Sequence, residues 1–542
     1  MKNLNELFER RLKLMPKGIA CQWVDESSGR SRSYTWFDLH QRNIRLKRAL
    51  GDAHSRGEPV AVMLENGPSF LIVSQFLMQQ GVVVVPINPD DTIERLSHIL
   101  TDIQSTSIYC SPALSHIVKD QLSQDHPALC WLTISTDGEL LDYQINKQQV
   151  VSSFPGLSEQ DVAFVLYTSG SSGSPKGVLL THAHILSNLQ ATQLRLPTRS
   201  SDRFYAMQHP AYAFELIVTI FLPLYVGARI IFAPLGESLS YMNEASPSIV
   251  ICTPLLLQKL TDQIYRHRSS LLRNGLLNML VGFLIKRFWR SAIEKVAGSD
   301  LRLLVCGGAA ISDRQLREVN RLGLPWVYGY GSTEAGPVVS LNSAGPQDGS
   351  VGEVLSGIAW RISQGGELLL QGDFVSPNYL HASPRRSDYF HTGDLVKQRH
   401  GRLFVTGRIK DAIQLQDGRM INAKVLEQQI CANDEFEHAL VVGEGLPGLV
   451  AIVFLAQGFE QKLKQNPKQE LKQEALKDPR LLDEVRTRIR LSAKKTAHAC
   501  VVDNVILAAS SRMEEAGYVS NGKLSRKRVI KGFQKEIDAL YR

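Results

Sequence analysis

Short runs of apolar and β-branched residues recur along the N-terminal part of the chain, and longer segments with helical periodicity separate them. The clearest runs are PVAVMLE (59–65), VVVVP (82–86), VAFVLY (162–167), RIIFA (229–233), SIVIC (248–252) and LRLLVC (301–306). Strands of this kind are buried on both faces, and their alternation with helices is typical of parallel sheets covered by helices. The pattern therefore predicts an α/β fold with a large, multi-layer N-terminal domain built on parallel-rich sheets.

The length and a change in composition indicate a second domain. The chain has 542 residues, which is more than one hydrophobic core usually serves. After GRLFVTGR (401–408) the predicted elements become shorter and the sequence more charged, as in the solvated stretch at 461–480. We expect an N-terminal domain over residues 1–407 and a small, mobile α+β C-terminal domain over residues 408–542.

Charge and cysteine usage narrow the class of partner. The net charge is +8, from 61 basic and 53 acidic residues, which suits nucleotides, CoA or a membrane surface but is too diluted for nucleic acid. Seven cysteines without CxxC or CxxH spacing argue against a disulfide framework or a zinc site, and for a reducing compartment. The N-terminus lacks the apolar core of a secretory signal. We therefore expect a cytoplasmic protein.

One segment has the composition of a membrane-surface helix. SLLRNGLLNMLVGFLIKRFWR (270–290) contains an eleven-residue apolar centre, with Arg273 before it and KRFWR (286–290) after it. The apolar centre is too short to span a bilayer. Basic flanks with aromatic residues suit a helix at the inner face of a membrane, and an amphipathic helix packed on the protein body is the alternative.

A glycine- and hydroxyl-rich loop, YTSGSSGSPK (167–176), follows the apolar run that ends at Tyr167. Its glycines allow close approach of the backbone to a ligand, and its N–H and hydroxyl groups can wrap a polyphosphate. The loop is not a Walker motif, because Lys176 follows proline and precedes glycine. A flexible Ser/Gly linker is the alternative. The residues expected to bind phosphate are Thr168, Ser169, Gly170, Ser171, Ser172, Gly173 and Lys176.

Two later segments combine glycines with groups that suit a nucleotide. CGGAAI (306–311) follows a predicted strand, so its glycines would let a planar ligand lie near the backbone at the carboxyl edge of a sheet. In VYGYGSTEAG (327–336), Tyr330 could stack on a base, while Thr333 and Glu334 offer hard oxygens for Mg²⁺. The candidate nucleotide-binding residues here are Gly307, Gly308, Ala309, Gly329, Tyr330, Gly331 and Ser332.

Three polar segments complete the set. FHTGDL places Asp394 in a turn, where its carboxylate could accept hydrogen bonds from ribose hydroxyls. GRIKD supplies Arg408, and NGKLSRKR supplies Lys523 in a glycine-containing turn. Taken singly, each has an ordinary alternative as a surface turn or a solvated lysine, so their joint presence and order carry the argument.

In this order the segments resemble the adenylate-forming superfamily of acyl-CoA synthetases, luciferases and peptide-synthetase adenylation domains. YTSGSSGSPKGV is similar to the family's phosphate loop, GYGSTE to its nucleotide and Mg²⁺ motif, and FHTGDL to its ribose motif. GRIKDAI is similar to the hinge, with Lys410 as its pivot, and NGKLSR to the C-terminal lysine motif. The resemblance runs from SYTWFDL (33–39) to NGKLSRKR (521–528).

Within this superfamily the long-chain fatty acyl-CoA synthetases look most similar. Support comes from PVVSLN after Glu334, from the hydrophobic insertion at 270–290, and from AFELIV (213–218) in the region of the acyl gate. Tyr212 stands where the family commonly has a gate histidine, and His209 nearby is the possible substitute. SPNYL (376–380) lacks the usual glycine before its tyrosine.

The resemblance implies a reaction in two halves. A carboxylic acid and MgATP give acyl-AMP and pyrophosphate, and the thiol of CoA then displaces AMP. Glu334 and Thr333 would hold Mg²⁺, Lys176 the phosphates, and Lys523 the reacting carboxylate and α-phosphate. Two alternatives are an acyl-AMP ligase that loads an acyl carrier protein and a catalytically inactive nucleotide or lipid binder.

Overall fold

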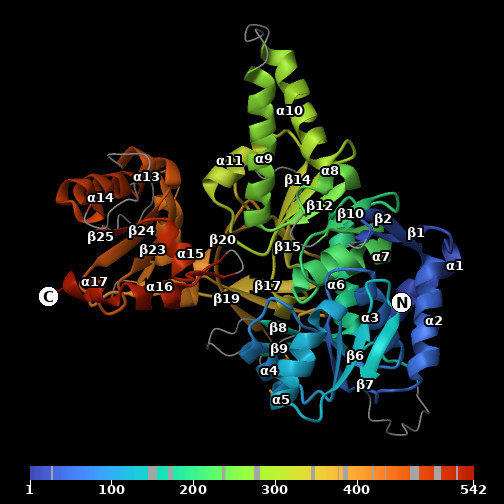
Figure 1. The fold of residues 1–542 in the computed structure, drawn as a ribbon. Helices are drawn as coiled ribbons and strands as arrows, with labels where there is room; N and C mark the ends of the chain where they lie inside the picture. The colour runs from blue at the N-terminus through green and yellow to red at the C-terminus, as the bar shows by residue number, and fades with distance from the viewer. Residues whose placement is uncertain are drawn as a thin grey trace.

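A computed structural model gives a large body that contains the N-terminal elements and a smaller unit, formed after residue 410, to one side of it (Figure 1). In this view the N-terminus lies in the body and the C-terminus at the far side of the smaller unit. The residues that the structure describes are 1–25, 28–144, 156–168, 175–234, 238–273, 281–342, 348–375, 378–382, 389–417, 420–431, 433, 435–463, 475–493, 502–520 and 523–541.

The first large sheet of the body has the strand order β16-β15-β14-β13-β12-β10-β11-β1-β2. Its interior pairs, from β1 to β14, are parallel, and its edge pairs are antiparallel. The strands are β1 Ile19–Asp25, β2 Arg30–Thr35, β10 Arg203–Ala206, β11 Arg229–Phe232, β12 Ile249–Cys252, β13 Leu303–Cys306, β14 Trp326–Tyr330, β15 Ser340–Leu341 and β16 Glu353–Val354.

The second large sheet has the order β7-β6-β5-β3-β4-β8-β9, again with a parallel centre and antiparallel edges. Its strands are β3 Pro59–Met63, β4 Val83–Pro86, β5 Ser107–Cys110, β6 Cys130–Ile134, β7 Leu140–Gln144, β8 Val162–Thr168 and β9 Lys176–Thr181. All six apolar runs noted in the sequence are strands of these two sheets, and the predicted α/β class is confirmed.

Helices fill the space between the two sheets. α3 (Pro68–Gln79) contacts β1 of one sheet and β4 of the other, and its residues from Pro68 to Met78 are all buried. Phe164 of β8 packs edge-to-face on Phe221 of the π-helical segment η3 (Glu215–Phe221), with ring centroids 5.5 Å apart. Each large apolar side chain buried in this way contributes about 1.5–3 kcal/mol. The main hydrophobic core therefore lies between the sheets.

The remaining helices of the body cover the outer faces or connect strands. The residues just before three of them, Thr35, Thr181 and Ser312, form capping boxes at their first turns. These helices are α1 Asn5–Leu14, α2 Trp36–Leu50, α4 Ile93–Asp102, η1 Pro112–Leu114, η2 Ile117–Leu122, α5 Ser123–Asp125, α6 His182–Arg195, α7 Leu222–Val226, α8 Met242–Ala245, α9 Pro254–Arg273, α10 Val281–Ala297, α11 Asp313–Arg321 and η4 Thr333–Ala335.

A four-stranded antiparallel sheet, in the order β17-β18-β19-β20, follows the two large sheets in the chain. Its strands are β17 Ile358–Ile362, β18 Glu367–Gly372, β19 Phe390–Arg399 and β20 Arg402–Arg408. η5 (Ile409–Asp411) then leads to the short hairpin of β21 (Ala412–Gln414) and β22 (Met420–Asn422). The smaller unit begins here.

The smaller unit is α+β, built on β23 (Phe436–Val442), β24 (Leu449–Leu455) and β25 (Val502–Ala508). Alternate residues of β24 enter two different cores, because successive strand side chains point to opposite faces. Helices supply both cores. They are α12 Ala423–Ile430, α13 Gln457–Leu463, η6 Ala475–Lys477 and α14 Pro479–Ala493, followed by α15 Ser511–Glu515, α16 Arg526–Gly532 and α17 Gln534–Ala539, with the short strands β26 Val519–Ser520 and β27 Lys523–Leu524.

Candidate active site

The glycine-rich loop joins two paired strands. β8 ends at Thr168, and its register partner on β9 is Lys176, so the segment returns as a hairpin rather than running on as an interdomain linker. Gly177 is needed for packing here, since a Cβ on it would lie 2.8 Å from Cγ1 of Val165. Five predicted phosphate-binding residues, Ser169, Gly170, Ser171, Ser172 and Gly173, lie outside the described residues.

A tyrosine brings the phosphate-loop lysine and the predicted magnesium ligand together. Lys176 Nζ lies 5.7 Å from the centroid of the Tyr379 ring, and the Tyr379 hydroxyl donates to Glu334 Oε1 at 3.0 Å. The backbone of Tyr379 is held by an antiparallel bridge to Val178 of β9. We did not predict Tyr379 from the sequence, although it lies in the SPNYL segment that departs from the family pattern.

Thr333 and Glu334 begin η4, which is separated from the end of β14 by two residues and lies at the carboxyl edge of the first sheet. Among the described residues, Ser332 Oγ is buried without a hydrogen-bond partner. No cluster of three His, Cys, Asp or Glu residues in the described chain could hold a metal ion by itself. One carboxylate with a hydroxyl nevertheless suits Mg²⁺, which is commonly held by one or two carboxylates plus substrate phosphates.

Asp394 lies in a strand, so the prediction that it occupies a turn was wrong. Gly393, with φ +72°, gives the TGD sequence a local turn-like conformation, but the chain continues through β19, where Asp394 pairs with Arg408 of β20. This register explains the ion pair, in which Arg408 Nε lies 2.8 Å from Asp394 Oδ1. Asp394 is buried while the Arg408 side chain is largely exposed.

The Tyr330 hydroxyl donates to the other oxygen of Asp394, Oδ2, at 2.6 Å. Burial, followed by the adjacent carboxylate, raises the pKa of Tyr330 well above its usual range, so this hydroxyl stays a donor. Burial also raises the pKa of Asp394, and Arg408 opposes that rise. Two hydroxyl–carboxylate hydrogen bonds therefore lie near the end of β14. Tyr330 donates to Asp394, and Glu334, four residues after Tyr330, accepts from Tyr379.

The glycines around β13 and β14 are required by packing of the protein itself. A Cβ on Gly307 would lie 2.9 Å from the Phe214 ring, one on Gly329 2.7 Å from Leu341, and one on Gly331 1.6 Å from the Pro337 carbonyl oxygen. Gly308 has φ +79°, a conformation that favours glycine. The carbonyl of Ala309 accepts a bond from the Tyr328 hydroxyl at 3.0 Å. These contacts fix the loop that follows β13 beside β14.

The two predicted gate residues have different surroundings. His209 is tied to the backbone at both ring nitrogens, to the Leu64 carbonyl at 2.7 Å and to the Ala211 N–H at 3.1 Å. Burial lowers the pKa of His209 to about 4, so the ring is neutral and fixed. Tyr212 is 39% exposed, and its hydroxyl accepts a bond from Asn88 Nδ2 at 3.2 Å. Of the two, Tyr212 has the more exposed side chain.

A buried carboxyl lies just beyond these residues. The Glu215 side chain is 0% exposed; it accepts bonds from the Gln208 N–H at 3.3 Å and the Thr219 hydroxyl at 3.0 Å. Burial raises the pKa of Glu215 to about 8. We did not single it out from the sequence, where the isolated acid in the apolar stretch AFELIVTIF was a usable signal.

The two predicted C-terminal lysines lie apart from this cluster in the sequence. Lys410 is exposed in η5, between the last strand of the four-stranded sheet and β21. Lys523 begins β27, where its register partner is Ser520 of β26, and its side chain lies outside the described residues. The hinge and catalytic roles of these lysines stay predictions.

Comparisons with known proteins agree on a family but differ in substrate. Residues 8–380 match the model of the family described as "AMP-binding enzyme", and residues 410–542 match "AMP-binding enzyme C-terminal domain". A long-chain-fatty-acid–CoA ligase, FadD15, of Mycobacterium bovis is 23% identical, covering 90% of this chain and 88% of the relative. An L-proline–[L-prolyl-carrier protein] ligase of Pseudomonas fluorescens is 27% identical, covering 82% of this chain and 87% of the relative.

Solved structures share the fold over nearly the whole chain. The anthranilate CoA ligase AuaEII, in complex with anthranoyl-AMP, has a TM-score of 0.73 at 18% identity and covers 98% of this chain and 97% of its own. O-succinylbenzoate coenzyme A synthetase of Bacillus subtilis, in complex with ATP and magnesium ion, has a TM-score of 0.71 at 16% identity, with coverages of 97% and 99%. Since the first family model spans more than half of the sequence, the chain belongs to the AMP-binding, adenylate-forming enzymes, which activate a carboxylic acid with ATP.

Proposed function

We propose that the protein is an AMP-forming fatty acyl-CoA ligase, with residues 1–407 as the AMP-binding domain and 408–542 as a mobile lid. The observation that carries the adenylation site is the pair of hydroxyl–carboxylate bonds at the end of β14, Tyr330 to Asp394 and Tyr379 to Glu334. The Tyr379 ring of the second bond also lies 5.7 Å from Nζ of Lys176, the lysine of the predicted phosphate loop. The relatives include a long-chain-fatty-acid–CoA ligase, which supports the choice of acid and acceptor.

The proposed chemistry needs positioning and charge compensation rather than a covalent nucleophile. Lys176 and the loop after β8 would hold the phosphates of ATP, while Glu334 with Thr333 would hold Mg²⁺. When bound, Mg²⁺ would neutralise phosphate charge as the two anionic reactants meet. Lys523 would contact the carboxylate and the α-phosphate in the first half-reaction, and a rotation about Lys410 would then open the site to the thiol.

The identity of the acid and the acceptor can be tested together. Pyrophosphate release is measured across straight-chain acids of increasing length, aromatic acids and amino acids, with CoA, with a carrier protein bearing phosphopantetheine, or with neither. We expect a clear preference for straight-chain acids and a thioester product with CoA. Turnover of an amino acid or an aromatic acid alone would contradict the fatty-acid assignment. Transfer only to the carrier protein would instead favour an acyl-AMP ligase, the class that the L-prolyl relative suggests.

Tyr379 is proposed to position Glu334 for the metal. Tyr379→Phe removes the hydroxyl that holds Oε1 of Glu334, and losing one such bond costs about 1 kcal/mol, or about five-fold in kcat/KM. We expect the Mg²⁺ concentration for half-maximal pyrophosphate release to rise as well. Tyr389→Phe is the matched control, because it makes the same substitution at a different tyrosine. The ring centroid of Tyr389 lies 4.2 Å from Cζ of Arg361. An unchanged Mg²⁺ dependence in Tyr379→Phe would contradict the positioning role.

Lys410 is proposed as the pivot between the two half-reactions. Lys410→Pro fixes φ near −65° and restricts the preceding residue, so we expect thioester formation to slow more than adenylation. Single-turnover measurements of pyrophosphate release and of acyl-CoA formation separate the two steps. Lys410→Ala, which leaves φ unrestricted, should preserve both rates. Equal loss of both half-reactions in the proline variant would argue against a hinge at this residue.

A further inference from the structure

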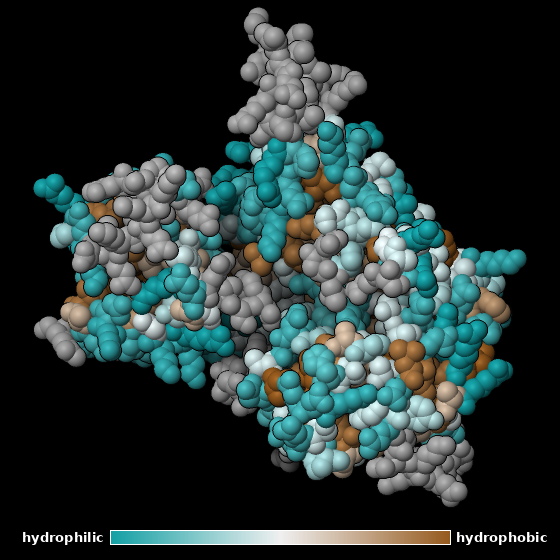
Figure 2. All heavy atoms as spheres, in the orientation of Figure 1, coloured by the Kyte–Doolittle hydropathy of each residue, from teal (hydrophilic) through white to brown (hydrophobic). Residues whose placement is uncertain are grey.

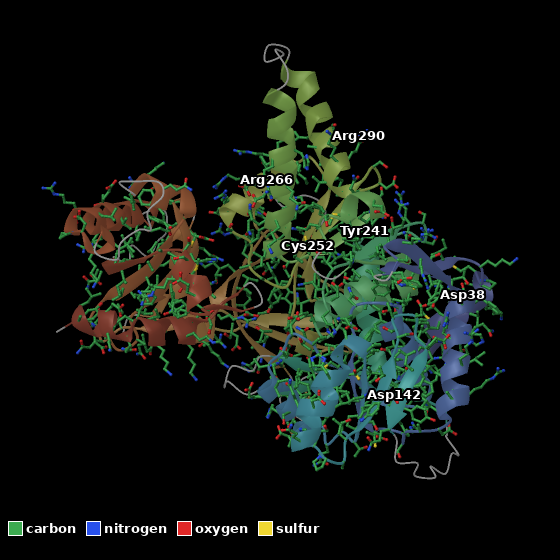
Figure 3. All side chains as sticks on the ribbon, viewed as in Figure 1. Asp38, Asp142, Tyr241, Cys252, Arg266 and Arg290 are labelled. Carbon is green, nitrogen blue, oxygen red and sulfur yellow. The ribbon has the colours of Figure 1, made fainter. Side chains whose placement is uncertain are left out.

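The side chains proposed to bind the phosphates of ATP and Mg²⁺ come from two different sheets. Lys176 begins β9 of the second sheet, and Glu334 lies in η4, after β14 of the first sheet. Figure 3 labels one residue of each sheet, Cys252 of β12 and Asp142 of β7, and shows them in different parts of the body. The placement of Glu334 relative to Lys176 therefore depends on contacts between elements of the two sheets.

α6 is attached to the strand that begins with Lys176. It starts at His182, directly after β9 ends at Thr181, and it contacts β9, α7 and η3. A capping box fixes its first turn, since the Thr181 side chain accepts from the His184 N–H and the His184 ring accepts from the Thr181 N–H. In Figure 1 α6 lies between β9 and β15. The helix is thus held firmly on the second sheet and extends towards the first.

One side chain of α6 reaches the loop that follows Glu334. Nδ2 of Asn188 donates to the carbonyl of Val338 at 2.8 Å, and Val338 lies four residues after Glu334. The loop approaches the helix closely here, because a Cβ on Gly336 would lie 3.2 Å from Asn188 Nδ2 and 2.7 Å from the Phe374 carbonyl oxygen. The Asn188 bond therefore joins α6 to the segment that carries Glu334.

The burial of Asn188 is not explained by packing alone. Figure 2 shows hydrophilic residues over much of the described surface in view, where water can satisfy polar groups. Asn188 is instead 0% exposed, and within the described chain its Oδ1 has no hydrogen-bond partner. Burying an unpaired amide oxygen destabilises a fold, and an apolar residue would avoid that cost. The bond from its N–H to Val338 is what distinguishes asparagine from an apolar residue of similar size.

We propose that Asn188 is a positioning residue for Glu334. By holding the Val338 carbonyl, it fixes the loop that follows Glu334, and hence the carboxylate that would bind Mg²⁺. This role of Asn188 rests on the proposed metal-binding function of Glu334. Tyr379, whose backbone pairs with β9, holds the Glu334 side chain directly, whereas Asn188 holds the backbone beyond it. Both contacts connect the phosphate-loop strand to Glu334.

Direct measurement of metal binding tests the proposal without turnover. Mn²⁺ takes the place of Mg²⁺, and the electron paramagnetic resonance signal of the free ion is followed in the presence of a non-hydrolysable ATP analogue. Asn188→Leu nearly keeps the side-chain volume but removes the donor, and Asn188→Ala removes both. We expect each variant to bind Mn²⁺ about five-fold more weakly, the effect of losing one buried hydrogen bond. The Mg²⁺ concentration for half-maximal pyrophosphate release should rise by a similar factor.

Asn5→Leu and Asn5→Ala are the matched controls, because Asn5 has similar surroundings elsewhere in the body. Asn5 is 5% exposed, its Nδ2 donates to the Met78 carbonyl at 3.1 Å, and its Oδ1 has no partner among the described residues. We expect these controls to change the melting temperature about as much as the Asn188 variants do, and to bind Mn²⁺ as the wild type does. Wild-type affinity in both Asn188 variants, or an equal loss in the Asn5 controls, would overturn the proposal.

Glu334→Gln distinguishes loss of the positioning role from loss of the metal site itself. We expect this variant to bind Mn²⁺ more weakly than either Asn188 variant. If Glu334→Gln loses affinity while the Asn188 variants keep it, the positioning role alone is wrong. If Glu334→Gln binds Mn²⁺ as the wild type does, the proposed metal role of Glu334 is wrong, and the positioning role of Asn188 is overturned with it.

Discussion

Replacing Lys523 by alanine is expected to lower the rate of acyl-adenylate formation about 10²–10³-fold while leaving ATP affinity nearly unchanged. The proposed contact of Lys523 is with the carboxylate and the α-phosphate as charge develops between them, and losing one such transition-state contact costs about 3–4 kcal/mol. The groups proposed to bind ATP in the ground state, Lys176 and Glu334, belong to the body and remain in place. Acid-dependent ATP–pyrophosphate exchange and equilibrium binding of ATP measure the two effects separately.

Lys527 provides the matched control for this variant. It is an exposed lysine on α16, four residues further along the chain, and Lys527→Ala removes the same charge from the same unit. We expect exchange to stay near the wild-type rate in that protein. Undiminished exchange in Lys523→Ala would exclude the proposed role. A parallel loss of ATP binding would instead make Lys523 a ground-state ligand.

The strands of the body could be predicted because burial on both faces leaves a local signal. VVVVP and SIVIC are apolar throughout, and both are strands, β4 and β12. Their division between two sheets could not be predicted, because β1 reaches β11 across some two hundred residues of chain and no local pattern encodes that pairing. The sequence thus predicts strands well and their neighbours poorly.

The candidate site shows the same division between local and long-range information. Glycine-rich segments are visible in sequence, and CGGAAI follows a strand, β13, as expected. Asp394 was assigned to a turn because TGD commonly forms one, yet the antiparallel pairing of β19 with β20 decides its conformation. Tyr379 was missed because its contacts to Lys176 and Glu334 are made only by the tertiary fold.

Residues 270–290, which belong to α9, α10 and the sequence between them, show how a prediction from composition can differ from the structure at a single residue. The 270–290 segment was expected either to meet a membrane or to pack on the body, with Trp289 as an interfacial aromatic. Trp289 packs on Tyr265, with ring centroids 4.8 Å apart, so this residue belongs to the protein body. Contact of the rest of the segment with a membrane stays a prediction.

Glu215→Gln is expected to change how the stability of the body depends on pH. Burial raises the pKa of Glu215 from 4.5 to about 8, and its described bonds come from neutral donors, the Gln208 N–H and the Thr219 hydroxyl. Between these two values the folded state holds a proton that the unfolded state has released, so the free energy of unfolding of the wild type falls as pH rises. The full difference is on the order of 5 kcal/mol, taken as an upper bound.

The glutamine variant has no proton to lose at this position, and its amide can keep bonds to the same neighbours. Its free energy of unfolding, relative to wild type, should therefore increase between about pH 5 and pH 8, by about 2–5 kcal/mol. Urea midpoints of the body, followed by tryptophan fluorescence at several pH values, measure this difference. Glu9→Gln, at an exposed glutamate, is the control and should follow the wild-type curve. If Glu215→Gln also follows that curve, Glu215 is ionised in the folded protein, and a cation or a water-filled path must then reach its buried carboxylate, because an unpaired buried charge would not be tolerated.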